Sequence, residues 1–159
     1  MKAILACDLN GGIGFNGRLP WGSIPGDLPR FKSLTHQKAV IMGRGTYEST
    51  DMPVPLPNRK NYVVSSTLDS VKDGVTLLNS VEQAATIPDA WVIGGSLLFN
   101  SMLAHIDTIE LTYVKATHTC DTWINLDQIR SEFELVHNQE WDTHSFQTWK
   151  RKCNNTLIV

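Results

Sequence analysis

The sequence has 159 residues, a length that suits one domain with a sizeable core. It is 42% hydrophobic and 19% charged, as in a globular protein, and its net charge of −2 argues against a nucleic-acid-binding protein, which needs a basic surface. No apolar run is long enough for a membrane span or a signal peptide. The cysteines are widely spaced, at Cys7, Cys120 and Cys153, so we expect a reducing cytoplasm and neither a disulfide framework nor a metal site.

The first half of the chain alternates between apolar runs and segments with helical spacing. Leu28, Phe31 and Leu34 recur at the spacing of one helix face. The segment 52–59 holds three prolines and is predicted to be a loop. We expect a strand at 2–9, a loop at 10–25, a helix at 26–36, a strand at 38–43 and a short helix at 44–50.

The second half begins in the same alternating way and ends without helices. Ser80 and Gln83 form a capping-box pattern at the start of a helix. We expect strands at 61–66, 75–78, 90–95 and 107–117, helices at 80–87 and 96–104, and a final hairpin of strands at 133–142 and 144–152. This order predicts an α/β fold with a mostly parallel sheet that ends in antiparallel strands. The last residues, CNNTLIV, have no predicted role.

The segment 11–22 reads GGIGFNGRLPWG and contains G-x-G-x-x-G, the pattern of a dinucleotide-binding loop. Such a loop needs a helix that begins within the glycines, so that its N-terminus faces the pyrophosphate. Pro20 and Pro25 exclude a continuous helix here, and we reject this interpretation. We predict a mobile lid instead, with Leu19 and Trp21 as its large apolar contacts.

Two other glycine turns lie between a strand and a helix, which is the context that phosphate binding requires. One contains Gly94 and Gly95, and the other contains Arg44, whose forked cation suits a phosphate. Each has a plainer interpretation, a tight packing turn or a surface arginine. Together with Ser65 and Ser66 at a strand end, they predict one phosphate-binding edge that fits NADPH rather than NADH.

Asp27 stands in the first turn of the helix expected at 26–36. It could simply complement the helix dipole. However, it shares a helix face with Phe31, and its neighbours Ile24 and Leu28 are apolar. A buried carboxylate needs a partner, and a flat heterocycle with two parallel N–H donors would satisfy both of its oxygens.

Several motifs, in this order and spacing, resemble the dihydrofolate reductase family of the bacterial type: IGFNGRLPW, DLPRFK, VIMGRGTYES, PLPNRKN, VIGG and IELTYV. The resemblance runs from about Ala3 to Lys150. It implies a single domain over residues 1–159, with a mostly parallel eight-stranded sheet, an antiparallel C-terminal edge strand and about four flanking helices. It also implies NADPH-dependent reduction of 7,8-dihydrofolate to tetrahydrofolate, in support of one-carbon and thymidylate metabolism.

The resemblance implies a role for each matching residue. Asp27 would hold the pterin and promote protonation of N5, Thr112 would support the same edge through water, and Trp21 would order that water. Arg59 would bind the glutamate α-carboxylate. The other substrate contacts would be Ile4, Leu5, Leu28, Phe31, Lys32, Leu56 and Ile93. The cofactor contacts would be Ala6, Ile13, Gly14, Asn16, Gly17, Arg18, Leu19, Arg44, Gly45, Thr46, Ser65, Ser66, Gly94, Gly95, Ser96, Leu97, Leu98 and Phe99.

The sequence departs from the family pattern at a few positions. Phe99 replaces a common tyrosine, Leu97 replaces an arginine of some members, and the lid and the proline loop each carry an insertion. Two alternatives remain, a ribosylaminopyrimidine reductase of riboflavin synthesis and an NADPH binder without turnover. The former is expected to lack Asp27 and Arg59. We expect a cytoplasmic monomer that acts on a small molecule, is an antifolate target, and has no nucleic-acid or membrane partner.

Overall fold

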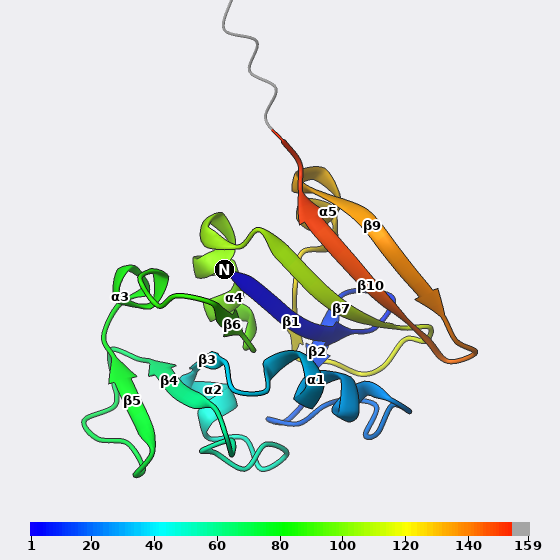
Figure 1. Cartoon of the computed structure of the whole chain (residues 1–159). Coiled ribbons are helices and arrows are strands. Elements are labelled where there is room, and N and C mark those ends of the chain that lie inside the picture. Colours follow the sequence, from blue (N-terminus) through cyan, green and yellow to red (C-terminus); the bar gives the residue numbers. More distant parts are fainter. Residues whose placement is uncertain (154–159) are drawn as a thin grey trace, which may run out of the picture.

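The computed structural model describes residues 1–153, so the tail from residue 154 lies outside the described part. Its main sheet has eight strands in the order β5-β4-β3-β6-β1-β7-β10-β9 (Figure 1). These strands are β1 (Lys2–Cys7), β3 (Ala39–Gly43), β4 (Lys60–Val64), β5 (Val75–Leu78), β6 (Ala90–Val92), β7 (Thr108–Val114), β9 (Phe133–Glu140) and β10 (His144–Arg151). A two-stranded sheet joins β2 (Gly12–Gly14) to β8 (Thr122–Trp123).

The strands from β5 to β7 in this order pair in parallel, and β10 pairs antiparallel with both of its neighbours. The mostly parallel eight-stranded sheet is therefore confirmed. The antiparallel strand lies one position in from the edge, because β9 occupies the edge and runs in the same direction as β7.

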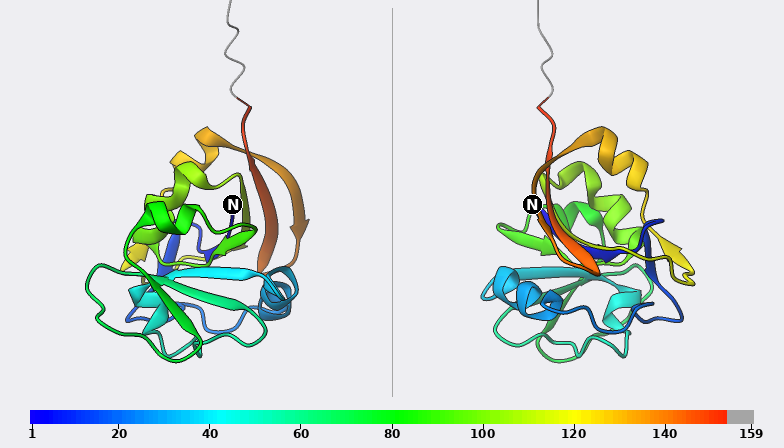
Figure 2. Two further views of the ribbon diagram at one scale, coloured as in Figure 1. Left: turned by 60° about the vertical axis from the view of Figure 1, so that its left-hand side comes forward. Right: turned by 90° about the vertical axis from the view of Figure 1, so that its right-hand side faces the viewer.

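The helices cover both faces of the sheet. In both views of Figure 2, α1 and α2 lie on one side and α3, α4 and α5 lie on the other. Alternate residues of each strand therefore face different helices. The helices are α1 (Asp27–Thr35), α2 (Arg44–Tyr47), α3 (Val81–Ala85), α4 (Ser96–Met102) and α5 (Leu126–Glu132), and a 3₁₀ turn, Leu103–His105, follows α4.

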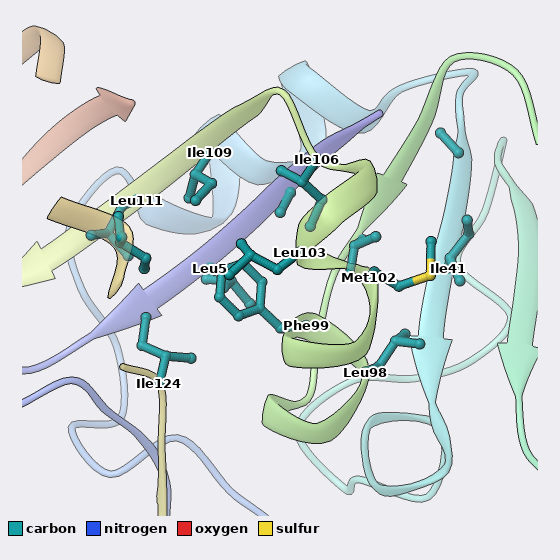
Figure 3. Close-up of a cluster of buried hydrophobic side chains, with 14 of the residues drawn as sticks. Leu5, Ile41, Leu98, Phe99, Met102, Leu103, Ile106, Ile109, Leu111 and Ile124 are labelled. Carbon is teal, nitrogen blue, oxygen red and sulfur yellow. The ribbon is translucent and has the colours of Figure 1, made fainter. Parts of the chain in front are cut away.

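Two hydrophobic cores result from this alternation. Leu5 and Ile41 belong to the core under α3, α4 and α5, where Phe99 is 1% exposed (Figure 3). Ile4 and Val40, next to them in the sequence, belong to the core under α1 and α2. Burial on both faces explains why the parallel strands read as continuous apolar runs.

Most expected elements are present with shorter bounds. Ser80 is confirmed as the N-cap of α3, since its Oγ accepts a hydrogen bond from the Gln83 N–H at 3.2 Å, while Gln83 Oε1 accepts the N–H of Asn79 rather than that of Ser80. Helix α5, capped by Asn125, was not expected and adds a fifth α-helix within residues 1–153. No helix of the described residues is long and apolar enough to cross a membrane.

Candidate functional site

The parallel strands all point their carboxyl ends toward the same edge of the sheet, where ligands of open α/β sheets bind. The lid follows β1, the Arg44 turn follows β3, the serine pair follows β4 and the glycine pair follows β6. Because β4, β3, β6 and β1 are neighbours, the topology gathers these four segments along one edge.

Asp27 lies at the other end of this edge, on the face that α1 covers. Gly26, with a φ of 79°, turns the chain into α1, so that Asp27 is its first residue. The Thr112 hydroxyl on β7 donates a hydrogen bond of 2.6 Å to Asp27 Oδ1. Thr112 is 1% exposed, whereas Asp27 is half-buried and can meet a ligand with its other oxygen.

Phe31 and Arg59 extend the site along α1. The Arg59 guanidinium lies 5.7 Å from the centre of the Phe31 ring. Its Nη1 donates to Thr35 Oγ1 at 3.0 Å, and its Nε donates to the Pro57 carbonyl at 3.0 Å. Burial lowers the pKa of Arg59 below its usual value. Two hydrogen bonds therefore fix the plane of the guanidinium and leave its remaining N–H groups for an anion.

The other predicted substrate residues differ in exposure. Leu28 is 59% exposed beside Asp27, and Lys32 is an exposed residue of the last turn of α1. The remaining ones are buried, with 7% or 8% of each side chain exposed: Ile4, Leu5, Leu56 and Ile93. Leu5 faces the core on the opposite side of the sheet from Phe31, so its side chain does not join the others.

The lid is a small hairpin rather than the start of a helix. Phe15 and Arg18 exchange backbone hydrogen bonds of 2.9 and 3.0 Å. Between them, Asn16 and Gly17 have φ angles of 51° and 74°, as in the Asn-Gly turns of two-residue hairpins. Gly12 lies in β2, where a Cβ would come within 2.3 Å of Cys120 Sγ. Gly17 thus serves a tight turn, and Gly12 allows a close contact with Cys120.

Asp121 connects the lid to the segment before β8. Its carboxylate accepts the Asn16 N–H at 2.9 Å, and its own N–H donates to the Gly14 carbonyl at 2.9 Å. Hydrogen bonds from the Asn16 N–H and the Thr122 hydroxyl lower the pKa of Asp121. The lid tip is therefore tied to an ionised carboxylate.

The loop after α2 holds the opposite side of the lid. Ser49 Oγ donates to the Gly17 carbonyl at 2.8 Å, and Asp51 Oδ2 accepts the Leu19 N–H at 2.9 Å. Arg18 Nε donates to Thr50 Oγ1 at 3.2 Å. Leu19, directly after the lid hairpin, is 42% exposed. We name these contacts of residues 17–19 with residues 49–51 the lid latch.

Asp8 fixes the base of the lid. It is 1% exposed, and its carboxylate accepts the N–H groups of Asn10, Gly12 and His118, each at 2.9 Å. Burial alone would raise the pKa of Asp8, but these hydrogen bonds outweigh it and lower the pKa. The same carboxylate contacts Cys120 Sγ at 3.7 Å. Asp8 thus joins the two segments that carry the lid.

Trp21 lies between the lid hairpin and Asp27 in the sequence. Its ring packs edge-on against His118, with ring centres 5.8 Å apart. Its Nε1 is buried and has no hydrogen-bond partner among residues 1–153. A buried N–H donor of this kind needs a water or ligand partner, which makes Trp21 suitable for holding a polar molecule.

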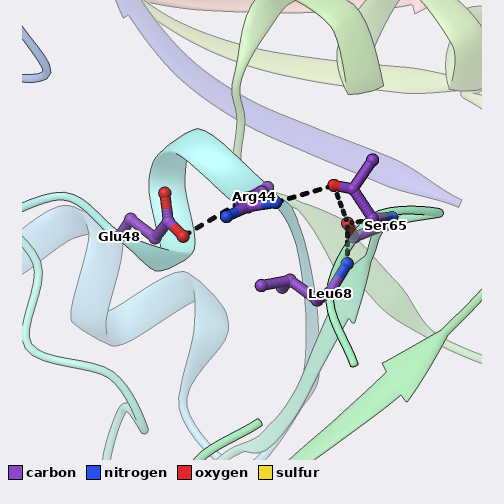
Figure 4. Close-up of polar contacts among 5 residues, drawn as sticks. Arg44, Glu48, Ser65 and Leu68 are labelled. Atoms are coloured by element: carbon purple, nitrogen blue, oxygen red, sulfur yellow. Dashed lines mark hydrogen bonds and ion pairs between the residues drawn. The ribbon is translucent and has the colours of Figure 1, made fainter. Parts of the chain in front are cut away.

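The proposed phosphate end of the site centres on Arg44 (Figure 4). Its Nη1 donates to Thr67 Oγ1 at 2.8 Å and its Nε to Glu48 Oε1 at 2.9 Å. Ser65 is 8% exposed, and its hydroxyl accepts the N–H groups of Thr67 and Leu68 at 3.1 and 3.2 Å. Ser65 therefore shapes the turn that orients Arg44, while Ser66 is exposed.

The glycine pair lies beside the Arg44 turn. The Gly43 N–H donates to the Gly94 carbonyl at 2.8 Å, which joins the ends of β3 and β6. Gly94 has a φ of 123°, and a Cβ there would approach Thr46 Oγ1 at 3.2 Å. A side chain at this position would be strained and crowded, so the close approach of the two turns requires glycine.

Helix α4 presents different side chains to the core and to solvent. Leu97 is 84% exposed, whereas Leu98 and Phe99 are 6% and 1% exposed and pack in the core shown in Figure 3. The side chains of Leu98 and Phe99 are thus part of the packing beneath the edge. Ala6 and Ile13, also predicted cofactor contacts, are half-buried.

Our sequence predictions did not include Asp8, Asp51 or Asp121 as site residues. Asp8 had a local signal, because an acid between an apolar run and a glycine turn commonly accepts nearby N–H groups. Asp51 and Asp121 reach the lid from 32 and 105 residues away, and no local pattern predicts such contacts.

Comparisons with known proteins agree with this geometry. A family model described as dihydrofolate reductase matches residues 1–154. The chain is 38% identical to the type 8 dihydrofolate reductase of Escherichia coli, with 96% of each covered, and 34% identical to the Staphylococcus aureus dihydrofolate reductase, with 99% and 92% covered. It also matches the structure of the Enterococcus faecalis enzyme complexed with NADP(H) and RAB-propyl, with a TM-score of 0.81, 32% identity and 96% of each chain covered. The chain belongs to the dihydrofolate reductase family.

Proposed function

We propose that this protein reduces 7,8-dihydrofolate to 5,6,7,8-tetrahydrofolate with NADPH, and that Asp27 is its active-site acid. The observation that carries the proposal is the half-buried Asp27 carboxylate, which Thr112 holds by one oxygen at 2.6 Å. The 2-amino group and N3 of a pterin offer two parallel N–H donors. A carboxylate at the rim of an apolar site satisfies both of them.

NADPH, when bound, supplies the hydride that C6 of dihydrofolate receives. The fit of the chain to this cofactor rests on the exposed cation of Arg44 and on the glycine turn at Gly94. Arg44 is 46% exposed and held by Thr67, and the absence of a Cβ at Gly94 lets a ligand approach the backbone closely. A dinucleotide with an extra phosphate suits this combination of charge and access.

The chain supports the proton transfer to N5 through Asp27 and Trp21. Asp27 is the acid that the proposal places at the pterin, and the proton itself would arrive from water. Trp21, with its buried Nε1–H, would hold that water, and Asp27 would raise the basicity of N5 or relay the proton. The product then has a new C–H bond at C6, formed with the hydride, and a new N–H bond at N5, formed with the proton.

Arg59 and the lid would supply binding and orientation. Arg59, whose plane is set by Thr35 and Pro57, would pair with the α-carboxylate of the substrate's glutamate. The lid would close over the nicotinamide through its contacts with Asp121 and the lid latch, and would exclude bulk water. In this function the chain would act as a cytoplasmic monomer in one-carbon and thymidylate metabolism and would be an antifolate target.

The test is to mix the purified protein with NADPH and dihydrofolate and to follow the loss of reduced-nicotinamide absorbance. Controls omit dihydrofolate or use Asp27→Asn. Oxidation that requires both dihydrofolate and Asp27 supports the proposal. Binding of NADPH without oxidation would identify an NADPH binder or an enzyme for another substrate.

A further inference from the structure

A second polar bridge joins α1 to β7 beside the bridge between Asp27 and Thr112. Arg30 Nη2 lies 2.5 Å from Glu110 Oε2. Thr148, on β10, donates its hydroxyl to the same oxygen of Glu110 at 2.7 Å. One carboxylate oxygen therefore ties a helix to two strands.

This bridge is well shielded from solvent. The Arg30 and Glu110 side chains are 19% and 14% exposed. The Arg30 guanidinium lies 4.9 Å from the centre of the Phe146 ring, and its Nη1 is buried with no partner among residues 1–153. The orientation of Arg30 thus depends on Glu110 and Phe146.

The two bridges lie next to each other along both α1 and β7. Arg30 lies three residues after Asp27, on the same face of α1. Glu110 lies two residues before Thr112, on the same face of β7. On β10, Thr148 is the partner of Glu110, and Phe146 is the partner of Thr112. The same face of the sheet therefore carries both bridges.

Two contacts between α1 and β7 restrict the helix more than one contact does. Packing of Phe31 and Leu34 in the core holds α1 on the sheet, and the hydroxyl of Thr112 holds the Asp27 carboxylate at the start of the helix. The ion pair three residues along the helix adds a second polar contact between the first turn of α1 and β7. Together the two contacts restrict the position and rotation of the first turn of α1, and with them the direction of the Asp27 carboxylate.

We propose that Arg30 and Glu110 are positioning residues that orient Asp27 for the pterin, with Thr148 holding Glu110 in place. This inference rests on the proposed function. A shielded ion pair is a poor source of stability, because the loss of hydration offsets the attraction, and apolar replacement of both partners is often neutral or stabilising. Orientation of a reacting group, by contrast, depends on sub-ångström placement.

The experiment compares Arg30→Met, Glu110→Met and the double variant with the wild type. For each protein we would measure kcat and KM for dihydrofolate, Kd for NADPH, Kd for dihydrofolate from quenching of tryptophan fluorescence, and Tm. Arg130→Met is the matched control, because Arg130 is an exposed helical arginine with a 3.9 Å ion pair to Asp127.

We expect kcat/KM for dihydrofolate to fall about tenfold in both single variants and in the double variant. The Kd for NADPH should stay near the wild-type value, and Arg130→Met should change neither quantity. The double variant should regain a Tm at or above that of the wild type while its kcat/KM and its affinity for dihydrofolate remain low. A purely structural ion pair would not separate stability from activity in this way.

A stable double variant with wild-type kcat/KM and wild-type dihydrofolate affinity would overturn the proposal. If the single variants fail to fold, the double variant and Thr148→Val decide it, and Thr148→Val should show a smaller loss of the same kind. Absence of turnover in the wild type would instead contradict the proposed function.

Discussion

The Leu19 N–H, directly after the lid hairpin, donates a hydrogen bond of 2.9 Å to the Asp51 carboxylate. Asp51 lies in the loop that follows α2. The lid is therefore held from two sides, by Asp51 after α2 and by Asp121 before β8. Because both contacts are exposed, each one contributes little to the stability of the whole protein but directly affects the lid.

Replacing Asp51 by alanine should loosen the lid without unfolding the protein. The change removes the acceptor of the Leu19 N–H and the 3.9 Å ion pair with Arg18. We expect NADPH to dissociate about two- to tenfold faster, which corresponds to the loss of one exposed hydrogen bond, with an unchanged Tm. Stopped-flow displacement of NADPH measures this rate. Asp73→Ala, at another exposed aspartate, is the control. Equal rates of NADPH dissociation in the two variants would contradict a role of the lid latch in holding the lid.

Replacing Asp27 by asparagine should reduce turnover far more than cofactor binding. An asparagine can still accept the hydrogen bond from Thr112, but it has no charge and cannot accept N–H donors with both side-chain atoms. We expect kcat to fall by about 10²–10⁴, the usual contribution of a positioned acid or base. Steady-state kinetics and NADPH titration check this. Equal losses in kcat and NADPH affinity would mean that Asp27 is structural.

Replacing Arg59 by lysine should raise KM for dihydrofolate while kcat changes little. The guanidinium is oriented by Thr35 and by the Pro57 carbonyl, and its remaining N–H groups can form a forked pair with a carboxylate. A lysine ammonium keeps the charge but cannot form that fork. We expect KM to rise about tenfold, as for the loss of one charge-assisted hydrogen bond. Arg130→Lys serves as the control, and an unchanged KM would remove Arg59 from the site.

The sheet was predictable because its signals are local. Each buried parallel strand reads as an apolar run, and each helix has a periodic face or a capping residue such as Ser80. Helix α5 was missed because its cap, Asn125, precedes a segment with few apolar residues. The predicted bounds 75–78 match β5, whereas the other predicted strands extend beyond the observed ones by one to three residues at one end or both.

The site was predictable only in part. Asp27 and Arg59 lie in short motifs that can be recognised from the sequence. Asp27 shares a helix face with Phe31, and Arg59 ends the segment with three prolines. The contacts of Asp51, Asp121 and Glu110 depend on how distant segments meet in the folded chain, which no short pattern contains. The roles of the substrate and cofactor residues remain predictions that ligand binding must test.

Asp8 makes stability depend on pH in a defined direction. Three backbone N–H groups outweigh the effect of burial and lower the pKa of its carboxylate in the folded state. A lowered folded pKa gives stability that is present above the ordinary pKa of about 3.9 and is lost as the pH falls through the lower folded value. Asp8 should therefore stabilise the lid base at neutral pH and lose this effect in acid.

The variant Asp8→Asn tests this directly. At neutral pH it should lower the free energy of unfolding by about 1–3 kcal/mol, because an amide cannot accept the same set of hydrogen bonds as the carboxylate. As the pH falls toward about 3, the wild type should lose stability faster than the variant, so that the difference in Tm shrinks. Thermal unfolding followed by circular dichroism across this range measures both curves. A difference in Tm that stays constant with pH would show that the Asp8 charge does not stabilise the fold and that the lid base depends on packing alone.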